Sequence, residues 1–451
     1  MRVLLINPYQ VYLVNKAGKI YNRVWPPLAL ANCAALLEEQ GHQVQIMDAN
    51  ALRLFPEEVA QEARNFHKVF ISSSSLDRWQ CPHVDIKPFL NTVAAVREGN
   101  EEVYVLGVHG TVRPEAVLNL TQAKAVIRGE PEWTVADICQ GKRLENTRGV
   151  AFMENGQMMI TPDQRPLDLD ALPRPAFHLL PMEKYFYEVL GSNFTLLESS
   201  RGCTFRCDFC LLKMYGQGVR RKSLAKLIEE IDYAVSRFGI KTSYFMDLEF
   251  TVFRRQILEL CRYLVKRQYD FQWTCQTRFD LVDEELLGKM RQAGCRLIHF
   301  GVEAGTDSRL ESIHKKMTVR QIEEGMRMVH RAKIDTACFF LLGFPDSTPE
   351  EIKQTVEFAK KLKPTYALFH VAVPYPGTLL YEQMQRSGKE AFHGTLFPEA
   401  CVEGEELKKL KKTARSAYAG YYLRPRYILS RLGKGEILSI FRQIKLFFGY
   451  L

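Results

Sequence analysis

The 451-residue chain has no run of eighteen or more apolar residues, so the sequence predicts no membrane-spanning helix. Its start, MRVLLINPY, has a single basic residue and a short apolar patch, which favours a first β-strand over a secretory signal peptide. No G-x-G-x-x-G motif follows that strand, which argues against a dinucleotide cofactor. The eleven cysteines are scattered through apolar contexts, as suits a reducing compartment. We therefore expect a cytoplasmic protein.

The positive charge of the chain is concentrated at one end. The formal net charge is +9, yet the stretch from Lys408 to the end holds eleven lysines and arginines against one acid, Glu436. The body of the chain is therefore close to neutral. Apolar residues make up 46% of the sequence, enough for sizeable cores in more than one domain.

Four segments can be separated along the chain. Residues 1–145 alternate short β-rich runs (3–7, 44–48, 69–74, 103–107 and 123–129) with helical patterns such as 27–41, which predicts a doubly wound, flavodoxin-like parallel sheet. Residues 146–192, with a hairpin turn at Asn155-Gly156 and many prolines, are expected to form an ordered linker. Residues 193–390 repeat the βα rhythm six times, and residues 391–451 form a basic helical tail.

The six expected strands of the third segment are 194–200, 243–247, 271–276, 296–302, 335–342 and 366–372. Six parallel βα units are too few for a closed eight-stranded barrel, so we expect a partial (β/α)6 barrel. Function in such a fold lies at the carboxyl ends of the strands.

The strongest chemical signal is LLESSRGCTFRCDFCLL at residues 196–212, where Cys203, Cys207 and Cys210 have the spacing C-x3-C-x2-C. Three thiolates can hold three corners of an iron–sulfur cubane and leave the fourth iron open for a small ligand. A structural zinc would need a fourth Cys or His, and none lies nearby in the sequence. An open-cornered [4Fe–4S] cluster is the favoured interpretation, with zinc as the alternative.

This spacing, with the aromatic Phe209 before the third cysteine, resembles the signature of the radical S-adenosylmethionine (SAM) enzymes. In that family the open iron binds the amino and carboxylate groups of SAM, and an electron from the cluster cleaves SAM to a 5′-deoxyadenosyl radical. The resemblance implies a reducing electron donor of the flavodoxin or ferredoxin type.

The same resemblance implies SAM contacts at the strand ends: Phe209, Asp247, Glu249, Gln276, Arg278 and Glu303. The family usually has two adjacent aspartates where this chain has Asp247-Leu248, so Glu249 is expected to compensate for the second acid. Gly301–Gly305 resembles the family's G-[IV]-E-S-G. For each of these polar residues the alternative is a solvated or salt-bridged position at the barrel mouth.

Residues 1–145 resemble the cobalamin-binding domain that precedes many radical SAM domains. The likeness rests on Asn7-Pro8 and residues 25–49, 107–115 and 128–132, although His109 lies in Gly-Val-His rather than the usual Gly-Gly-Pro-His. It implies cobalamin contacts from Ser73, Ser74, Gly107, His109, Gly110, Thr111, Gly129 and Glu130. The chain lacks the D-x-H-x-x-G motif, so that motif's histidine is not expected below the cobalt. The alternatives are a domain that only recognises substrate or has lost its cofactor, and a His109 without cofactor contact.

The basic tail is predicted to form helices over 406–422 and 435–448. Apolar residues share one face of the second helix, between lysines and arginines, which suits either an anionic membrane surface or the open edge of the barrel. Nucleic-acid binding is not expected, because no recognised motif accompanies the charge. The expected location is therefore cytoplasmic, with peripheral contact at the inner membrane face as the open alternative.

Together these features predict a cobalamin-dependent radical SAM enzyme with three cofactors: a [4Fe–4S] cluster, SAM and cobalamin. The leading hypothesis is methylation of an unactivated carbon in a lipid or other small molecule. The alternatives are a non-methylating cyclisation, coupling or rearrangement, and a non-catalytic iron–sulfur or cobalamin sensor.

Overall fold

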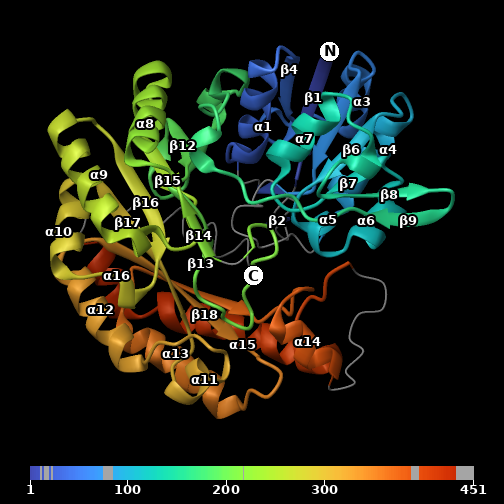
Figure 1. Ribbon diagram of the computed structural model, residues 1–451. Helices are drawn as coiled ribbons and strands as arrows, with labels where there is room; N and C mark the ends of the chain where they lie inside the picture. Colours follow the sequence, from blue (N-terminus) through green and yellow to red (C-terminus); the bar gives the residue numbers. More distant parts are fainter. Residues whose placement is uncertain are drawn as a thin grey trace.

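The computed structural model describes residues 1–10, 13–14, 20–21, 24–74, 85–216, 218–386 and 396–432. Two large, mainly parallel sheets lie beside each other in an arc (Figure 1). The first third of the chain builds one sheet, and residues 194–371 build the other. No helix within the described ranges is both long and apolar enough to cross a bilayer.

The first sheet has the strand order β4-β1-β5-β6-β7-β8-β9. Its first five strands are parallel, and their order relative to the sequence is the flavodoxin-like 2-1-3-4-5. Strands β1, β5, β6 and β7 are almost entirely buried apolar runs, as expected for strands covered on both faces, whereas the first half of β4 at the sheet edge is exposed. The bounds are β1 (Arg2–Asn7), β4 (Gln43–Asp48), β5 (Lys68–Ser72), β6 (Val103–Leu106), β7 (Ala125–Ile127), β8 (Val150–Glu154) and β9 (Gln157–Ile160).

Short helices connect these strands: α1 (Leu28–Glu39), α2 (Ala49–Leu52), α3 (Pro56–Ala63), α4 (Lys87–Arg97), α5 (Val108–Val112), α6 (Pro114–Thr121) and α7 (Pro131–Cys139). The β8–β9 hairpin extends the sheet in the antiparallel sense. The chain then crosses to the second sheet through 3-10 turns and a short hairpin of β10 (Phe186–Tyr187) and β11 (Gly191–Ser192).

The second sheet has six parallel strands in the order β12-β15-β16-β17-β18-β19, which confirms the predicted fold class. Its helices form the outer rim of the arc in Figure 1. The strands are β12 (Phe194–Leu197), β15 (Thr242–Phe245), β16 (Gln272–Thr277), β17 (Cys295–Glu303), β18 (Asp335–Leu342) and β19 (Tyr366–Val371). The helices are α8 (Leu224–Phe238), α9 (Arg254–Arg267), α10 (Glu284–Gln292), α11 (Asp307–Ser312), α12 (Val319–Arg331), α13 (Pro349–Leu362) and α14 (Leu379–Arg386).

Helix boundaries in this part follow recognisable capping residues. Ser223 caps the start of α8 by accepting a hydrogen bond from the Lys226 amide, and Gly239 ends the helix in the left-handed conformation. Thr318 and Gln321 form a reciprocal capping box at the start of α12. Strong local signals of this kind explain why these helices begin and end where they do.

One expected strand is wrong in its extent. The strand predicted over 194–200 ends at Leu197, and a separate strand β13 (Ser200–Cys203) pairs antiparallel with β14 (Gly218–Arg221). The break has a local cause: Asp247, beyond the end of β15, accepts hydrogen bonds from Ser199 and Ser200 and turns the chain out of the sheet.

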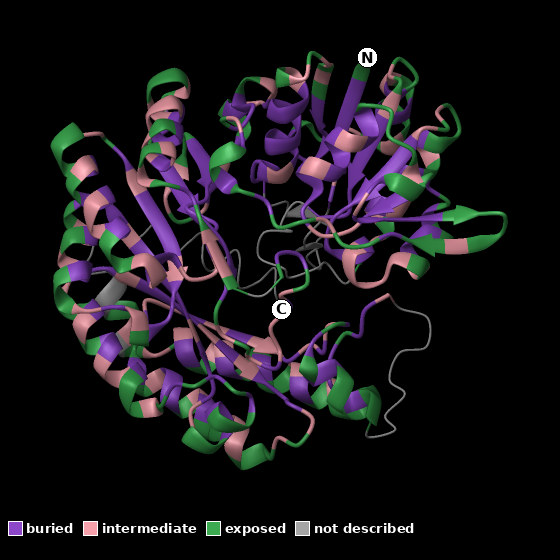
Figure 2. Ribbon diagram, in the orientation of Figure 1, coloured by how far each residue is buried: buried purple, intermediate pink, exposed green. Residues whose placement is uncertain are grey.

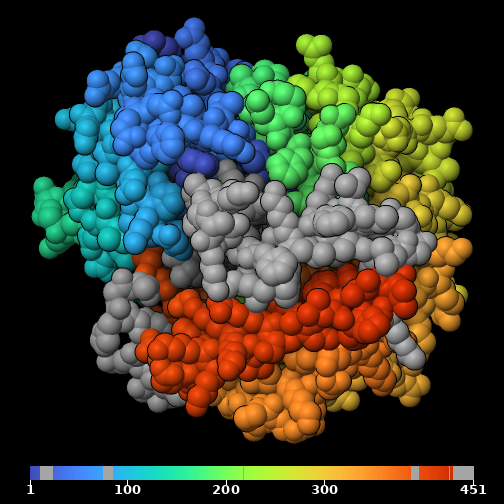
Figure 3. All heavy atoms as spheres, turned by 180° about the vertical axis from the view of Figure 1, so that it is seen from behind, coloured from blue at the N-terminus to red at the C-terminus, as the bar shows by residue number. Residues whose placement is uncertain are grey.

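The C-terminal helix α15 (Gly404–Tyr422) covers the free edge of the second sheet at β19. The Tyr422 hydroxyl lies 3.0 Å from both the amide nitrogen and the carbonyl oxygen of Ala367, so it replaces the partners that a further strand would supply. Figure 3 shows α15 lying across this part of the surface, and Figure 2 shows both sheets buried beneath exposed helix faces. Helix α16 (Pro425–Leu432) follows, and the predicted helix 435–448 lies outside the described residues.

Candidate functional site

The three cysteines occupy a hairpin loop at the centre of the molecule. Cys203 is the last residue of β13, and Cys207 and Cys210 lie in the connection to β14. Gly202 has φ +91°, and a Cβ built there would lie 2.1 Å from the carbonyl oxygen of Gly218 on the facing strand. A glycine at this position therefore lets the two strands close directly beside the first cysteine.

The cysteine loop is held in place by Asp208, a buried residue that lies between Cys207 and Cys210 in the sequence. Its backbone pairs with Ile313 and Leu380 on either side, at 3.1 and 2.9 Å. Its carboxylate lies 2.7 Å from His314 Nδ1 and accepts a hydrogen bond of 3.1 Å from Gln383. The loop is thus attached to the segments after α11 and at α14.

The thiols suit a metal cluster by their chemistry. Burial raises the pKa of Cys203 to about 12 and also raises the pKa of Cys207, so metal binding at these thiols is coupled to release of their protons. Among the described residues, no three His, Cys, Asp or Glu side chains converge tightly enough to hold a single metal ion. Cys203, Cys207 and Cys210 lie on one loop, and thiolates are the soft ligands that iron–sulfur clusters take.

The two acids after β15 have different environments. Asp247 is fully buried and accepts hydrogen bonds from the amide of Ser199 and the hydroxyls of Ser199 and Ser200. Glu249 is half-buried, and its solvent-inaccessible Oε2 atom has no hydrogen-bond partner among the described residues. Burial raises the pKa of Glu249 to about 7, although Lys315 and Arg278 act against the rise. Glu249 is the better placed of the two to accept a hydrogen bond from a ligand.

Arg278, one of the predicted SAM contacts, already has protein partners for its guanidinium donors. Both ends of its guanidinium donate to Asp280 at 2.8 Å, and its remaining donors reach the backbone carbonyls of Lys315 and Lys316. The guanidinium also lies 3.7 Å from the ring centre of Phe205, inside the cysteine loop. In this arrangement Arg278 braces the loop against the segment after α11.

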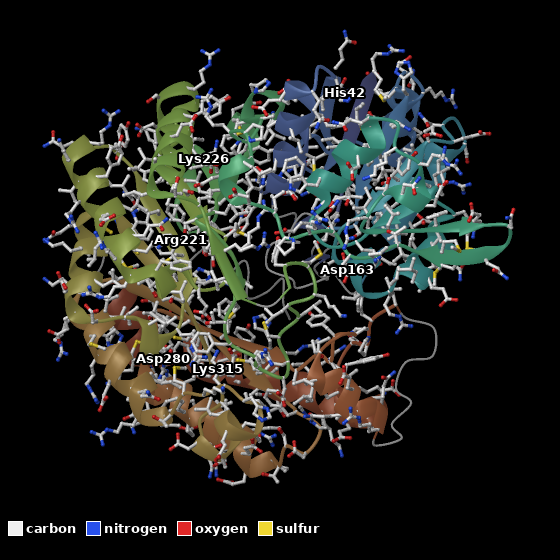
Figure 4. All side chains as sticks on the ribbon, in the orientation of Figure 1. His42, Asp163, Arg221, Lys226, Asp280 and Lys315 are labelled. Atoms are coloured by element: carbon white, nitrogen blue, oxygen red, sulfur yellow. The ribbon has the colours of Figure 1, made fainter. Side chains whose placement is uncertain are left out.

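A buried ion pair lies beside the same loop. Glu303, at the end of β17, accepts a hydrogen bond of 3.0 Å from Lys315. Burial acts to lower the pKa of Lys315, yet the carboxylate of Glu303 and the neighbouring Cys207 keep it above its ordinary value. A Cβ at Gly301 would lie 2.3 Å from Glu303 Oε1, so the missing side chain makes room for the pair. Figure 4 shows Lys315 near Asp280, and Arg278 contacts both residues.

Lys315 was not among the residues singled out from the sequence. It lies in Ile313–Met317, where buried and exposed side chains alternate without regular secondary structure.

Gln276, one of the predicted SAM contacts, lies near the end of β16 with weak contacts of 3.4 Å to Tyr244 and the Leu248 carbonyl. Phe209 packs edge-on against Phe344, with ring centres 6.2 Å apart.

The carboxyl-terminal edge of the first sheet holds the other predicted site. The strand order reverses between β1 and β5, which is where ligands bind in this kind of sheet. Ser73 and His109 meet there through a 2.9 Å contact between Oγ and Nδ1, both side chains being buried. Ser74 lies in the same turn, next to Ser72, and Gly107 adopts φ +115° at the start of α5.

This edge also carries buried polar atoms without a partner. Asn7 Oδ1, at the end of β1, and Gln10 Oε1, just beyond it, have no hydrogen-bond partner within the described part of the chain. Orphaned acceptors at a switch point fit a cofactor rich in amide donors, such as cobalamin. Gly110, by contrast, packs inward: a Cβ there would lie 2.4 Å from a methyl carbon of Val126.

Three predicted cobalamin residues lie instead where the two domains touch. The Thr111 hydroxyl lies 3.1 Å from the sulfur of Met214, just beyond the third cysteine, and accepts a hydrogen bond from the Gly129 amide. Glu130 forms ion pairs with Arg201 and Arg220 of the β13–β14 hairpin. The structure therefore brings the switch-point edge of the first sheet and the cysteine loop into direct contact.

Two family models match the chain in these two domains. The B12 binding domain model matches residues 19–138, and the radical SAM superfamily model matches residues 197–359, which includes all three cysteines. The chain is a B12-binding protein of the radical SAM superfamily. These two domains imply a [4Fe–4S] cluster, SAM and cobalamin as cofactors.

Several curated proteins are similar to this radical SAM protein over most of its length. An uncharacterized methyltransferase of Pyrococcus horikoshii is 29% identical over 466 aligned positions, covering 99% of this chain and 97% of the relative. The anaerobic magnesium-protoporphyrin IX monomethyl ester cyclase of Rubrivivax gelatinosus is 26% identical, covering 85% of this chain and 70% of that protein. The hopanoid C-2 methylase of Rhodopseudomonas palustris is 29% identical over 52% of this chain and 44% of that protein.

Solved structures of the same domain pair share the fold. The cobalamin-dependent radical enzyme OxsB, solved with aqua-cobalamin, superposes with a TM-score of 0.76 and 16% identity over 98% of this chain and 72% of that one. The methyltransferase TsrM of Kitasatospora setae superposes with a TM-score of 0.69 and 19% identity. The match covers 86% of this chain and 76% of the TsrM chain. At these identities the likeness establishes the fold alone.

Proposed function

We propose that this radical SAM protein is a cobalamin-dependent methyltransferase acting on an unactivated carbon of a lipid or other small molecule. The observation that carries the proposal is the contact between the switch-point edge of the B12-binding domain and the cysteine loop, through Thr111, Met214 and the ion pairs of Glu130. A methyl donor held at that edge and a radical made at that loop would meet the same substrate.

The cofactors supply the chemistry when bound: the cluster and SAM generate a radical that removes a hydrogen atom, and cobalamin carries the methyl group. The protein contributes ligands and position. Cys203, Cys207 and Cys210 would hold the cluster, and the unpaired carboxylate oxygen of Glu249 suits the ammonium group of SAM. Lys315, already charged through its pairing with Glu303, suits the carboxylate of SAM better than Arg278, whose donors are engaged.

A second enzymatic function has support from the relatives. One similar protein is named as a cyclase rather than a methyltransferase, at 26% identity over most of this chain. A non-methylating cyclisation or rearrangement would use the same cluster and SAM contacts. Either reaction needs an external one-electron reductant, which we propose to be of the flavodoxin or ferredoxin type.

The experiment that separates these functions is an anaerobic single-turnover assay of the reconstituted, reduced protein with methyl-labelled SAM. A methyltransferase forms both 5′-deoxyadenosine and S-adenosylhomocysteine, with label leaving SAM. Deoxyadenosine without S-adenosylhomocysteine would favour the cyclase-type reaction. Intact SAM after reduction of a fully loaded cluster would instead indicate a non-catalytic sensor.

A further inference from the structure

A group of buried charges joins the two domains immediately beside the first cysteine. Arg201, two residues before Cys203 in β13, has a side chain that is 1% exposed. Its guanidinium donates to Glu132 and Glu198 at 2.8 Å each and to Glu130 at 3.3 Å. One arginine thus binds three carboxylates in the interior of the protein.

Two of these carboxylates belong to the B12-binding domain. Glu130 and Glu132 flank Pro131 at the start of α7, directly after β7 of the first sheet. Glu130 also binds Arg220 of β14, with contacts of 2.6 and 3.0 Å. Both strands of the cysteine hairpin are therefore tied by an arginine to the same short segment of the other domain.

Stability alone is a poor explanation for this group, which we call the arginine–glutamate clasp (Arg201, Arg220, Glu130 and Glu132). Burying charges costs several kcal/mol per ion, and well-packed apolar residues often stabilise such a site at least as well. An arginine fork fixes the direction of its partners in a way that apolar contacts do not. The clasp therefore suits a junction where orientation matters.

We propose that the arginine–glutamate clasp sets the position of the B12-binding domain relative to the iron–sulfur loop, with Arg201 as the central positioning residue. The expected consequence for cofactor geometry rests on the proposed function, because it requires cobalamin in the first domain and a cluster on the loop. The expected effect on the order of the domain junction itself does not depend on the proposed function.

The test compares charge-balanced deletions of two buried ion pairs. Arg201→Gln with Glu132→Gln removes one positive and one negative charge from the main link between the domains; the Glu130–Arg220 pair remains, and Glu198 keeps Lys222 at 3.7 Å. Lys222→Gln with Glu230→Gln is the matched control: that pair is 2% and 1% exposed and has a 2.6 Å contact within the radical SAM domain. Lys222 also lies 3.7 Å from Glu198, so the control tests the radical SAM side of the junction and leaves Glu130 and Glu132 with their arginines. Arg201→Lys is a milder variant that keeps the charge and loses the fork.

The first measurement is hydrogen exchange by mass spectrometry on the full chain without cofactors. The clasp variant should show exchange faster by about tenfold or more on both sides of the junction, at residues 108–112 and 125–139 as well as 200–203. The control variant should show faster exchange around residues 198–203 and 222–230 and leave residues 108–112 and 125–139 of the B12-binding domain unchanged. Arg201→Lys should lie between the clasp variant and the unmodified chain.

The second measurement is a spectroscopic signature that a purely structural role would leave unchanged. With cob(II)alamin and the reduced cluster both loaded, the magnetic interaction between them reports their separation in the electron paramagnetic resonance spectrum. The clasp variant should give a broadened or altered interaction, whereas the control variant should match the unmodified protein.

Two results would overturn the proposal: equal exchange changes at residues 108–112 and 125–139 in clasp and control variants, or an unaltered magnetic interaction when the clasp is removed. If the unmodified protein takes up no cobalamin, the proposed function fails, and the exchange comparison still decides whether the clasp orders the junction. If the double clasp variant does not fold, hydrogen exchange and the magnetic interaction are compared between Arg201→Lys and the same control variant.

Discussion

Lys315 illustrates how strongly a single residue can depend on one partner. Its amine is buried against Glu303, and its neighbour Lys316 is exposed on the same short segment. Replacing Lys315 by Met leaves the Glu303 carboxylate buried without a cation, so we expect a loss of roughly 3–5 kcal/mol in unfolding free energy. Lys316→Met, the matched control, should stay within about 0.5 kcal/mol. Urea denaturation of the cofactor-free protein measures both, and equal losses would contradict the assigned burial.

Asp48 predicts a pH dependence of stability. This buried carboxyl accepts hydrogen bonds from Tyr185 and Asn7, and burial raises its pKa to about 6 from an ordinary value of 3.8. Because the folded state holds the proton more tightly, the contribution to stability is fully present below pH 3.8 and is lost as the pH rises through about 6.

Asp48→Asn should therefore stabilise the protein at pH 8, by up to roughly 3 kcal/mol, and have little effect near pH 4. Thermal unfolding at the two pH values measures the difference. A benefit that is equal at both pH values would show that the gain does not come from titration of this carboxyl.

The sequence alone predicts the cysteines as cluster ligands and the acids at the strand ends as SAM contacts, because local spacing defines both patterns. It could not show that Asp247 and Arg278 are occupied by protein partners, since Ser199 and Lys315 lie 48 and 37 residues away from them along the chain. Glu130 is the clearest case: its motif suggested a cofactor contact, and its actual partners are arginines 71 and 90 residues further on. Cofactor contacts for these residues stay predictions.

At the scale of elements, the β13–β14 hairpin offers a direct test of how the cysteine loop is built. A methyl group at Gly202 would collide with the Gly218 carbonyl, whereas one at Gly218 would meet no atom within 4 Å, and both glycines have positive φ. Both alanine variants therefore carry the strain of about 1–2 kcal/mol for that backbone conformation, and one of them also forces the strands apart.

We expect Gly202→Ala to lose most of its capacity to bind iron, and Gly218→Ala to retain most of it. Iron and sulfide content after anaerobic reconstitution measures the difference. Similar iron content in the two variants would mean that closure of the hairpin does not control assembly of the cluster site.

Elements were predictable where their boundaries are local. Helices α8, α12 and α13 begin at capping residues that can be read in the sequence. The hairpin was missed because a short apolar run continued by Ser199 and Ser200 looks like a single strand. Its interruption depends on Asp247, which approaches only once β12 and β15 pair in the sheet.

At the scale of the whole molecule, the C-terminal end of α15 and the following helix α16 expose several apolar side chains. Leu423 and Leu429 are each 67% exposed and Ile428 is 39% exposed, in a stretch whose lysines and arginines far outnumber its acids. An apolar face beside an excess of cations suits an anionic bilayer surface, where each cation near the surface adds about 1 kcal/mol. We expect the full chain to bind vesicles containing phosphatidylglycerol and to bind neutral phosphatidylcholine vesicles more weakly.

The substitution that tests this contact is Leu423→Gln with Leu429→Gln, because each buried leucine is worth about 1.5–3 kcal/mol. Vesicle co-sedimentation should then weaken by at least about tenfold, while Leu120→Gln, at a leucine 54% exposed on α6, should leave binding unchanged. Equal binding by the double variant and the unmodified chain would place the contact elsewhere. Loss that is equal in the Leu120 control would show that general surface polarity, and not α16, governs attachment to the membrane.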